Sequence, residues 1–329
     1  MTPRERTEEI EVQTLSKHAQ LVSATKGREV LEDEDDLRTC FQRDRDRIVH
    51  SKAFRRLGHK TQVFLAPEGD HYRVRLTHTL EVTQIARTIA RALRLNEDLT
   101  EAICLGHDLG HTPFGHMGEE VVAAFQPGFR HNLQSVRIVE VLEHLNLTWE
   151  VRDGIANHTW SMPMPSTLEG QIARYADRIA YINHDIDDAI RANVLSEEEL
   201  PRPTRDVLGN SHRERIAKMV QDVVSESHDR PEIRTSDDVL RAMDATREFL
   251  FERVYVGRVS EDTKEAVKRI LEALLHHYSS NPIPDSSEPP GADPKQASVD
   301  YVAGMTDRFA MRAFEYVVGT PPPGFGVLG

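Results

Sequence analysis

Helical periodicity extends along nearly the whole chain after residue 43, and it constrains the fold more than any other feature. Apolar residues recur a few positions apart, for example at Leu76, Leu80, Ile85, Ile89 and Leu93. This spacing places them along one face of an α-helix. Alternating runs typical of strands are nearly absent, except at residues 61–65 (TQVFL), ahead of the turn-forming PEGD at 67–70. The sequence therefore predicts an all-α fold with at most a short β-hairpin near residues 60–75.

Residues that begin or interrupt helices divide the chain into segments. Asn96, followed by the acidic Glu97 and Asp98, has the composition of a helix N-cap and its first turn. Helix-breaking residues cluster at 161–166, 281–294 and 320–329. After residue 116, helices are expected at about 117–126, 131–145, 148–157, 167–195, 204–225, 236–257, 261–280 and 296–317.

Four segments follow from these boundaries. Residues 1–40 are polar and acidic and are expected to form a loosely held N-terminal arm, and residues 41–280 form the core domain. A Pro-rich loop at 281–294 precedes a C-terminal helix and tail, residues 295–329, expected to pack on that core.

Composition excludes several classes of protein. Lys and Arg total 41 against 54 Asp and Glu, a net charge of −13, which argues against a general electrostatic hold on nucleic acid. No apolar run approaches the roughly 20 residues that span a bilayer, and the first residues lack the apolar region of a signal peptide. Two cysteines, Cys40 and Cys104, make no disulfide framework. We therefore expect a cytoplasmic protein without membrane association.

The segment from Gly106 to Glu119 carries the strongest chemical signal. It holds three histidines, an aspartate and a glutamate within fourteen residues. Burying so many ionisable groups without partners or a metal would be costly. His107 and Asp108 are adjacent, so both can flank one ion at a helix end, and His111 shares a helix face with His107.

Two residues far along the chain extend this pattern. His78 lies in the middle of an apolar-periodic helix, and Asp177 lies in another. A set of two histidines and two aspartates suits a divalent metal such as Mn, Mg, Fe or Co, with open positions for water or phosphate. The nearby His184 is expected to lie on a helix face away from Asp177 and to take no part.

Several motifs occur together and in the order found in one known family. They are FRRLGHKTQVF at 54–64, Arg75 with His78, HDLGHTPFGHMGE at 107–119, HNLQS at 131–135, Asp177-Arg178 with Tyr181 and Asp185, and REFLFERVY at 247–255. Over roughly residues 40 to 257, the chain resembles the HD-domain deoxyguanosinetriphosphate triphosphohydrolase-like (dNTPase) family. The resemblance implies an all-α HD-domain bundle. It also implies metal-dependent hydrolysis of a deoxynucleoside triphosphate (dNTP) to the deoxynucleoside and inorganic triphosphate.

The resemblance also implies roles for individual residues. The metal ligands are His78, His107, Asp108 and Asp177. His116 with Glu119 resembles the catalytic pair of the family, and His111 and His131 resemble its phosphate-facing histidines. The triphosphate would be held by Arg75, Arg178 and Arg247, and the sugar by Gln62, Tyr181, Asp185 and Tyr255.

Other interpretations remain open at this point. Taken singly, Arg178 and Arg247 fit ordinary exposed helix charges, and Tyr181 and Tyr255 fit core aromatics. The same metal site would serve another nucleotide phosphohydrolase or a 5′-nucleotidase of the HD superfamily. A dNTP-sensing or nucleic-acid-binding module with weak catalysis is the alternative from another class. The resemblance further implies a homo-oligomer. It leaves open the base preference, the native metal and whether dNTPs also act as allosteric activators.

Overall fold

The computed structural model describes residues 1–62, 73–191, 194–256, 261–283 and 293–323. Within these ranges every regular element is a helix, so the prediction of an all-α fold is confirmed. Two isolated β-bridges are recorded there, between Arg28 and Thr148 and between Thr61 and Val74. The second bridge flanks the expected hairpin, whose central residues 63–72 lie outside the described ranges.

The chain divides into two compact units, each assembled from three separate stretches. Unit 1 comprises Met1–His50, His78–His107 and Leu145–Arg258. Unit 2 comprises Ser51–Thr77, Asp108–His144 and Val259–Gly329. These boundaries differ from the expected ones at residues 40 and 280. One of them falls at the peptide bond between His107 and Asp108, inside the segment that carries the strongest chemical signal.

Unit 1 is organised around helix α9, Leu168–Arg191, which packs against α5, α8, α10 and α11. Helix α5 also packs against α2 and α8. Most of α9 is buried, which explains why its apolar residues recur on more than one face. The other helices that contribute to unit 1 are α1 Pro3–Thr14, α2 Cys40–His50, α4 Arg75–Leu93, α5 Glu97–Gly106, α8 Trp149–Asn157, α10 His212–Ser227 and α11 Asp237–Leu250. The unit also contains the short 3₁₀-helices η1 Val22–Ala24 and η4 Glu197–Glu199 and the short π-helices η5 Thr204–Leu208 and η6 Phe251–Val256.

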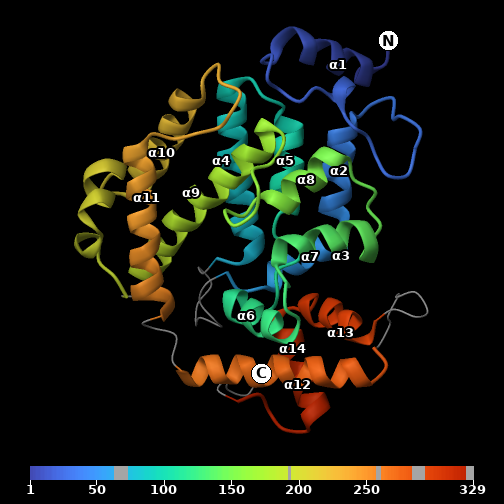
Figure 1. Cartoon of the computed structure of the whole chain (residues 1–329), viewed down its shortest axis with the longest axis vertical. Coiled ribbons are helices and arrows are strands. Elements are labelled where there is room, and N and C mark those ends of the chain that lie inside the picture. The colour runs from blue at the N-terminus through green and yellow to red at the C-terminus, as the bar shows by residue number, and fades with distance from the viewer. Residues whose placement is uncertain (63–72, 192–193, 257–260, 284–292, 324–329) are drawn as a thin grey trace. The chain divides into compact units, whose positions relative to one another are not determined.

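Unit 2 is organised around helix α12, Glu261–Ser280, which packs against α6, α13 and α14 (Figure 1). Phe114, Val122, Leu274 and Phe314 are among the buried residues of its core. Its other elements are α3 Lys52–Arg56, η2 Leu57–His59, α6 Gly115–Phe125, α7 His131–Arg137, η3 Ile138–Leu142, α13 Pro294–Ala303 and α14 Asp307–Val318.

Local chemistry sets several helix ends. The predicted cap of α5 is confirmed, because the Asn96 side chain accepts a hydrogen bond from the backbone N–H of Leu99. Two expected helices are interrupted. Gly209, with φ of +118°, separates η5 from α10, and Gly304 lies between α13 and α14. The Thr306 side chain then caps α14. Helical periodicity continued across both breaks, which is why the sequence predicted single helices there.

The first forty residues make specific contacts within unit 1. Glu11 on α1 is buried and accepts hydrogen bonds from the Val22 backbone at 2.9 Å and the Asn96 amide at 3.0 Å. Arg28 forms a buried ion pair with Asp44 on α2. In place of the loosely held arm that we expected, this part of unit 1 is tied down by buried polar contacts.

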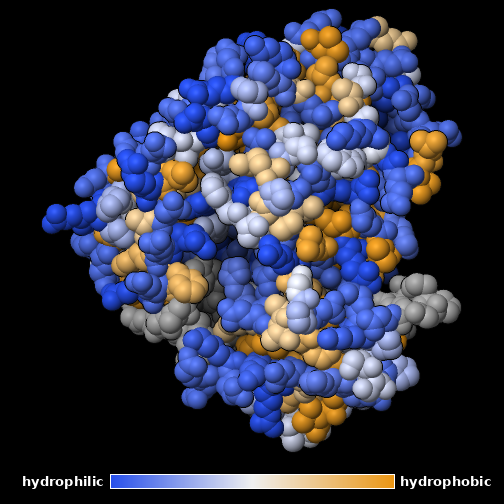
Figure 2. Space-filling view, in the orientation of Figure 1, coloured by the Kyte–Doolittle hydropathy of each residue, from blue (hydrophilic) through white to orange (hydrophobic). Residues whose placement is uncertain are grey.

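The surface offers no large apolar face in the view of Figure 2, where hydrophilic side chains surround small, separate hydrophobic areas. Among the described residues, no helix is both long enough and apolar enough to cross a membrane.

Candidate active site

Two predicted metal ligands of unit 1, His78 and His107, converge on a third, Asp177. His78 on α4 places its Nε2 atom 3.1 Å from Asp177 Oδ1. His107, directly after α5, places its Nε2 atom 3.8 Å from the same oxygen. Both histidines are buried. Burial alone would raise the pKa of the Asp177 carboxyl group, but the hydrogen bond from His78 and the neighbouring histidines lower it to about 2. A carboxylate therefore lies between two imidazoles.

Backbone carbonyls fix the tautomers of two of the histidines. His107 Nδ1 lies 2.6 Å from the carbonyl of Cys104, and His158 Nδ1 lies 2.9 Å from that of Ile155. A carbonyl only accepts, so in each ring Nδ1 carries a proton, and in a neutral ring Nε2 then keeps its lone pair. A lone pair on Nε2 is what a metal ion requires.

His158 is a member of this cluster that the sequence did not point to. Ligand atoms of His107, His158 and Asp177 all lie within 4.8 Å of one another, so the three residues could hold a metal ion. Two imidazole nitrogens and a carboxylate oxygen suit a first-row divalent ion. His158 stands alone at the end of α8, without a local motif, and only the packing of α8 in unit 1 brings it to the cluster. The fourth predicted ligand, Asp108, follows His107 directly in the chain.

Asp108 is the predicted metal ligand that belongs to unit 2. Its Oδ2 accepts a hydrogen bond from Arg75 Nη1 at 2.7 Å, and both side chains are buried. The loop that follows packs closely on α7. A Cβ atom at Gly110 would lie 2.2 Å from the Ser135 backbone nitrogen, so only glycine fits there.

Two side chains hold the loop at its far end. Lys60 is buried, and its Nζ donates to the carbonyls of His111 and Ala303. Asp307, at the start of α14, accepts from the backbone N–H groups of Thr61 and Phe114, each at 3.0 Å. Phe114 has a left-handed backbone with φ of +63°. Asp307 thus stabilises a turn that most residues avoid.

Glu119 on α6 is the centre of the histidine cluster in unit 2. It accepts hydrogen bonds from the His131 backbone at 2.8 Å and from His131 Nδ1 at 2.9 Å. His116 Nδ1 and His111 Nε2 lie 3.8 and 3.9 Å from Glu119 Oε2. The shortest contact of Glu119 is therefore with His131, whereas the sequence paired it with His116. His111 stacks on His131, with ring centroids 4.6 Å apart.

These contacts shift the pKa values of His131 and His111 in opposite directions. Burial disfavours a charged His131, but the Glu119 carboxylate more than compensates and raises the pKa of His131. The pKa of Glu119 is lowered despite burial, chiefly by His131. Burial, together with Arg75 and His131, lowers the pKa of His111 well below its usual value. His131 is thus the ring that favours the charged form and His111 the neutral one, while the His116 side chain is 63% exposed.

Several buried polar atoms in the described part of unit 2 make no hydrogen bond within the protein. Among the described residues, Arg75 Nε and Nη2, Gln62 Oε1 and His111 Nδ1 are buried and make no hydrogen bond. Each such group costs about 1–3 kcal/mol if it stays unsatisfied. All three side chains belong to residues for which the family resemblance implies contact with the substrate.

The predicted triphosphate and sugar residues of unit 1 lie on α9 and α11. Arg178 is buried, pairs with Asp244 and has its guanidinium carbon 4.3 Å from the ring centroid of Trp160. Burial raises the pKa of Tyr181 to about 12, so its hydroxyl stays protonated. Asp185 is buried, whereas Arg247 is exposed. Tyr255 belongs to η6, and its side chain is not among those described.

One sequence-based interpretation is contradicted. His184, expected to face away from Asp177, places its Nδ1 atom 3.3 Å from Nδ1 of His78. Asp177 and His184 are seven residues apart, which is almost two full turns of a helix, so both lie on nearly the same face of α9. The expected helix face was therefore wrong for His184.

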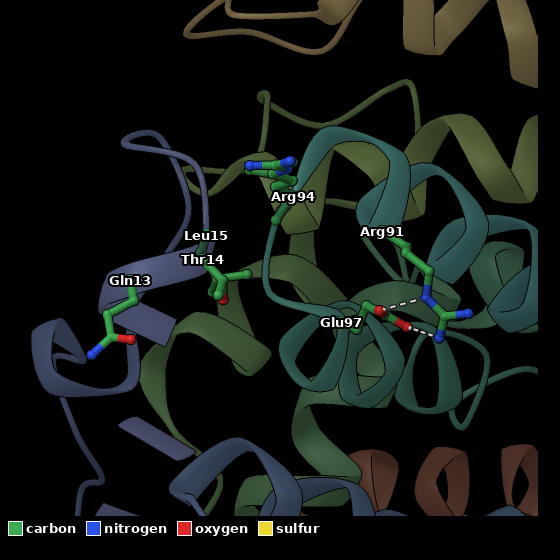
Figure 3. Close-up of a pocket in the computed structure, with 7 residues that line it drawn as sticks. Gln13, Thr14, Leu15, Arg91, Arg94 and Glu97 are labelled. Carbon is green, nitrogen blue, oxygen red and sulfur yellow. Dashed lines mark hydrogen bonds and ion pairs between the residues drawn. The ribbon is translucent and has the colours of Figure 1, made fainter. Parts of the chain in front are cut away.

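An open hollow elsewhere in unit 1 contains none of the predicted site residues. It lies by the end of α1 and the end of α4, lined by Gln13, Thr14, Leu15, Arg91, Arg94, Leu95 and Glu97 (Figure 3). Glu97 accepts from both Arg91 Nε and Nη2, at 2.8 and 2.7 Å, and so neutralises that guanidinium. The hollow therefore lacks the concentrated charge of the histidine clusters.

Comparison with known proteins gives the class of this fold and site. The model of the HD domain matches residues 75–182, which include His78, His107, Asp108 and Asp177. The family model of a phosphohydrolase-associated domain matches residues 233–316, from just before α11 through most of α14. The protein is an HD-domain protein, and its domain composition supports a phosphohydrolase function.

Similar proteins extend over nearly the full chain. A deoxyguanosinetriphosphate triphosphohydrolase-like protein of Caldanaerobacter subterraneus subsp. tengcongensis is 54% identical over 99% of this chain and 98% of its own. Proteins of the same description from Desulfatibacillum aliphaticivorans and Clostridium perfringens are 47% and 46% identical, each over at least 96% of both chains. The chain belongs to the deoxyguanosinetriphosphate triphosphohydrolase-like family. The likeness also covers the N-terminal residues and the region beyond residue 257, which the motifs alone had left outside it.

Proposed function

We propose that this protein hydrolyses dNTPs to the deoxynucleoside and inorganic triphosphate with the help of a divalent metal ion. The observation that carries the proposal is the convergence of His78 and His107 on Asp177, with Asp108 next to His107 in the chain. Membership of the family over the full chain length supports the same reaction class.

The metal ligands in this proposal are His78, His107, Asp108 and Asp177. The donor set fits a divalent ion because it combines imidazole nitrogen with carboxylate oxygen and because His107 keeps its Nε2 lone pair. When bound, such an ion neutralises phosphate charge and lowers the pKa of a water molecule.

Proton transfer falls to the cluster around Glu119. The 5′-oxygen of the departing deoxynucleoside is a poor leaving group and needs a proton, which a protonated His116 donates. Glu119 lies 3.8 Å from His116 Nδ1 and 2.9 Å from His131 Nδ1, so it can orient both rings. His116 is exposed enough to meet a substrate, whereas His131 and His111 supply a charged and a neutral imidazole beside it, facing phosphate oxygens.

Substrate selectivity follows from the residues around the phosphates and the sugar. A triphosphate carries about four negative charges, and Arg75, Arg178 and Arg247 offer three guanidinium groups. A monophosphate would not need three. The Nε and Nη2 atoms of Arg75, which make no hydrogen bond within the described part of the protein, can bind phosphate oxygens. Gln62, Tyr181, Asp185 and Tyr255 contact the deoxyribose, and Tyr181 stacks where a 2′-hydroxyl would clash.

Assembly and compartment belong to the same proposal. We propose a homo-oligomer, since the resemblance implies one, whose size light scattering would determine. Both Cys40 and Cys104 are free thiols, which suits the reducing cytoplasm that we propose as its location.

Product analysis tests the reaction. Purified protein incubated with each dNTP and Mn²⁺ or Mg²⁺ should yield deoxynucleoside and intact triphosphate on ion-exchange chromatography. Deoxynucleoside monophosphate with pyrophosphate would instead indicate attack that expels the other side of the α-phosphorus. Orthophosphate released from a monophosphate would favour a 5′-nucleotidase of the same superfamily. Tight dNTP binding without products would favour a dNTP-sensing module.

A further inference from the structure

The two ring nitrogens of His78 have different partners in unit 1. Nε2 lies 3.1 Å from Asp177 Oδ1, on the side of the proposed metal. Nδ1 lies 3.3 Å from Nδ1 of His184 on α9. The other nitrogen of His184, Nε2, lies 3.0 Å from Oε2 of Glu81. Both histidines are 1% exposed, whereas the Glu81 side chain is 40% exposed and reaches solvent.

These contacts limit where the protons can lie. The Glu81 carboxylate can only accept, so His184 Nε2 carries the hydrogen of that contact. In a neutral ring the remaining nitrogen, Nδ1, then has a lone pair and can accept from His78. Toward the Asp177 carboxylate alone, His78 Nε2 donates. A metal ion at Nε2 requires the lone pair there, so the proton of His78 then lies on Nδ1, where His184 can accept it. The tautomer of His78 that binds a metal ion is therefore the one whose Nδ1 proton meets an acceptor on His184.

We propose that His184, backed by Glu81, is a positioning residue for the metal ligand His78. It holds the ring orientation and offers an acceptor for the Nδ1 proton of the tautomer that metal binding requires. This inference rests on the proposed metal site. The backbone carbonyls of Cys104 and Ile155 accept the Nδ1 protons of His107 and His158. His184 would be the corresponding acceptor for the Nδ1 proton of His78.

The helix geometry makes the arrangement specific. His78 and Glu81 are three residues apart on α4, so both face the same neighbour. Asp177 and His184 lie almost two turns apart on one face of α9. One ligand and one supporting residue therefore come from each helix, and the four side chains alternate between α4 and α9.

Amide substitutions separate hydrogen bonding from packing. In asparagine Oδ1 occupies roughly the position of histidine Nδ1, whereas in glutamine Oε1 occupies roughly that of Nε2. His184→Asn therefore keeps an acceptor for His78, and His184→Gln loses it while retaining more side-chain volume. Metal affinity of the full-length, metal-free protein is measured by titration with Mn²⁺, following free Mn²⁺ by electron paramagnetic resonance.

We expect His184→Ala and His184→Gln to weaken Mn²⁺ binding about 10- to 100-fold. His184→Asn should stay within a few-fold of wild type, and Glu81→Ala should cause an intermediate loss. The matched control is His228→Ala, which removes an exposed histidine of unit 1 and should leave the affinity unchanged. Far-UV circular dichroism establishes that each variant is folded.

Two results would overturn the inference. Binding by His184→Gln as tight as by His184→Asn would mean that the acceptor at Nδ1 has no importance. Wild-type affinity in His184→Ala would remove the role of His184 altogether while leaving the metal site intact. His78→Ala distinguishes this from failure of the site itself, because undiminished Mn²⁺ binding in that variant would refute the proposed ligand set.

Discussion

Replacement of Lys60 by methionine should change how the stability of the protein depends on pH. The Lys60 ammonium group is buried beneath the active-site loop and donates to the carbonyls of His111 and Ala303. Burial lowers its pKa from 10.5 to about 7, and the nearby Arg56 and Arg75 add to this effect. Asp307 and Asp108 oppose it but do not compensate.

The magnitude follows from linkage. Because the pKa of Lys60 is lower in the folded state, the unfolded state binds more protons between about pH 7 and 10.5, and stability rises with pH across that window. The gap between 10.5 and about 7 corresponds to about 5 kcal/mol, present in full as a penalty below pH 7. Between pH 7 and 9 the wild type should therefore gain about 2 kcal/mol relative to Lys60→Met.

Urea denaturation followed by far-UV circular dichroism at pH 7, 8 and 9, with a chelator present, measures this difference. Lys60→Met also leaves two buried carbonyls without a donor, but that cost does not vary with pH. Only the slope of the difference against pH is diagnostic. Lys268→Met, an exposed lysine on α12, should show none. A constant difference between wild type and Lys60→Met over this range would refute the reasoning.

Four further substitutions test other parts of the molecule. Asp177→Asn should remove bound metal, as measured by elemental analysis, without loss of helical content; full occupancy would contradict the ligand assignment. His116→Ala should lower kcat by about 10²- to 10⁴-fold at unchanged metal content, and Glu119→Gln by a smaller factor. Equal turnover by His116→Ala would exclude it as the acid. Asp307→Asn leaves one acceptor for two backbone N–H groups, so thermal denaturation should report a loss of about 1–3 kcal/mol in unfolding free energy. An unchanged melting temperature would argue against the stabilisation of the turn at Phe114 by Asp307.

Local pattern predicted the helices well and their interruptions poorly. Caps such as Asn96 act over three residues, and helical periodicity is a property of neighbours, so both are visible in the chain itself. Gly304 and Thr306 also carry a local signal, but apolar residues at helical spacing continue beyond them into α14. Periodicity therefore outweighed a break that one glycine and one cap produce.

The same distinction applies to the candidate site. His78, His107 and Asp177 could be proposed together because their segments resemble those of a known family, and the structure brings the three side chains together. Their role as ligands stays a prediction. The pairing of Glu119 with His131, twelve residues away, was not anticipated, since the spacing of three residues to His116 was the more obvious one.

The sequence by itself determined the helical class, the family and the chemical types gathered around residues 107–119, because these depend on residue identity and short spacing. Tertiary structure decided which side chains support them. His184 and His78 are 106 residues apart, and Lys60 and Ala303 are 243 apart. No local pattern encodes such contacts, since they exist only once helices have packed and buried polar groups must find partners within the protein.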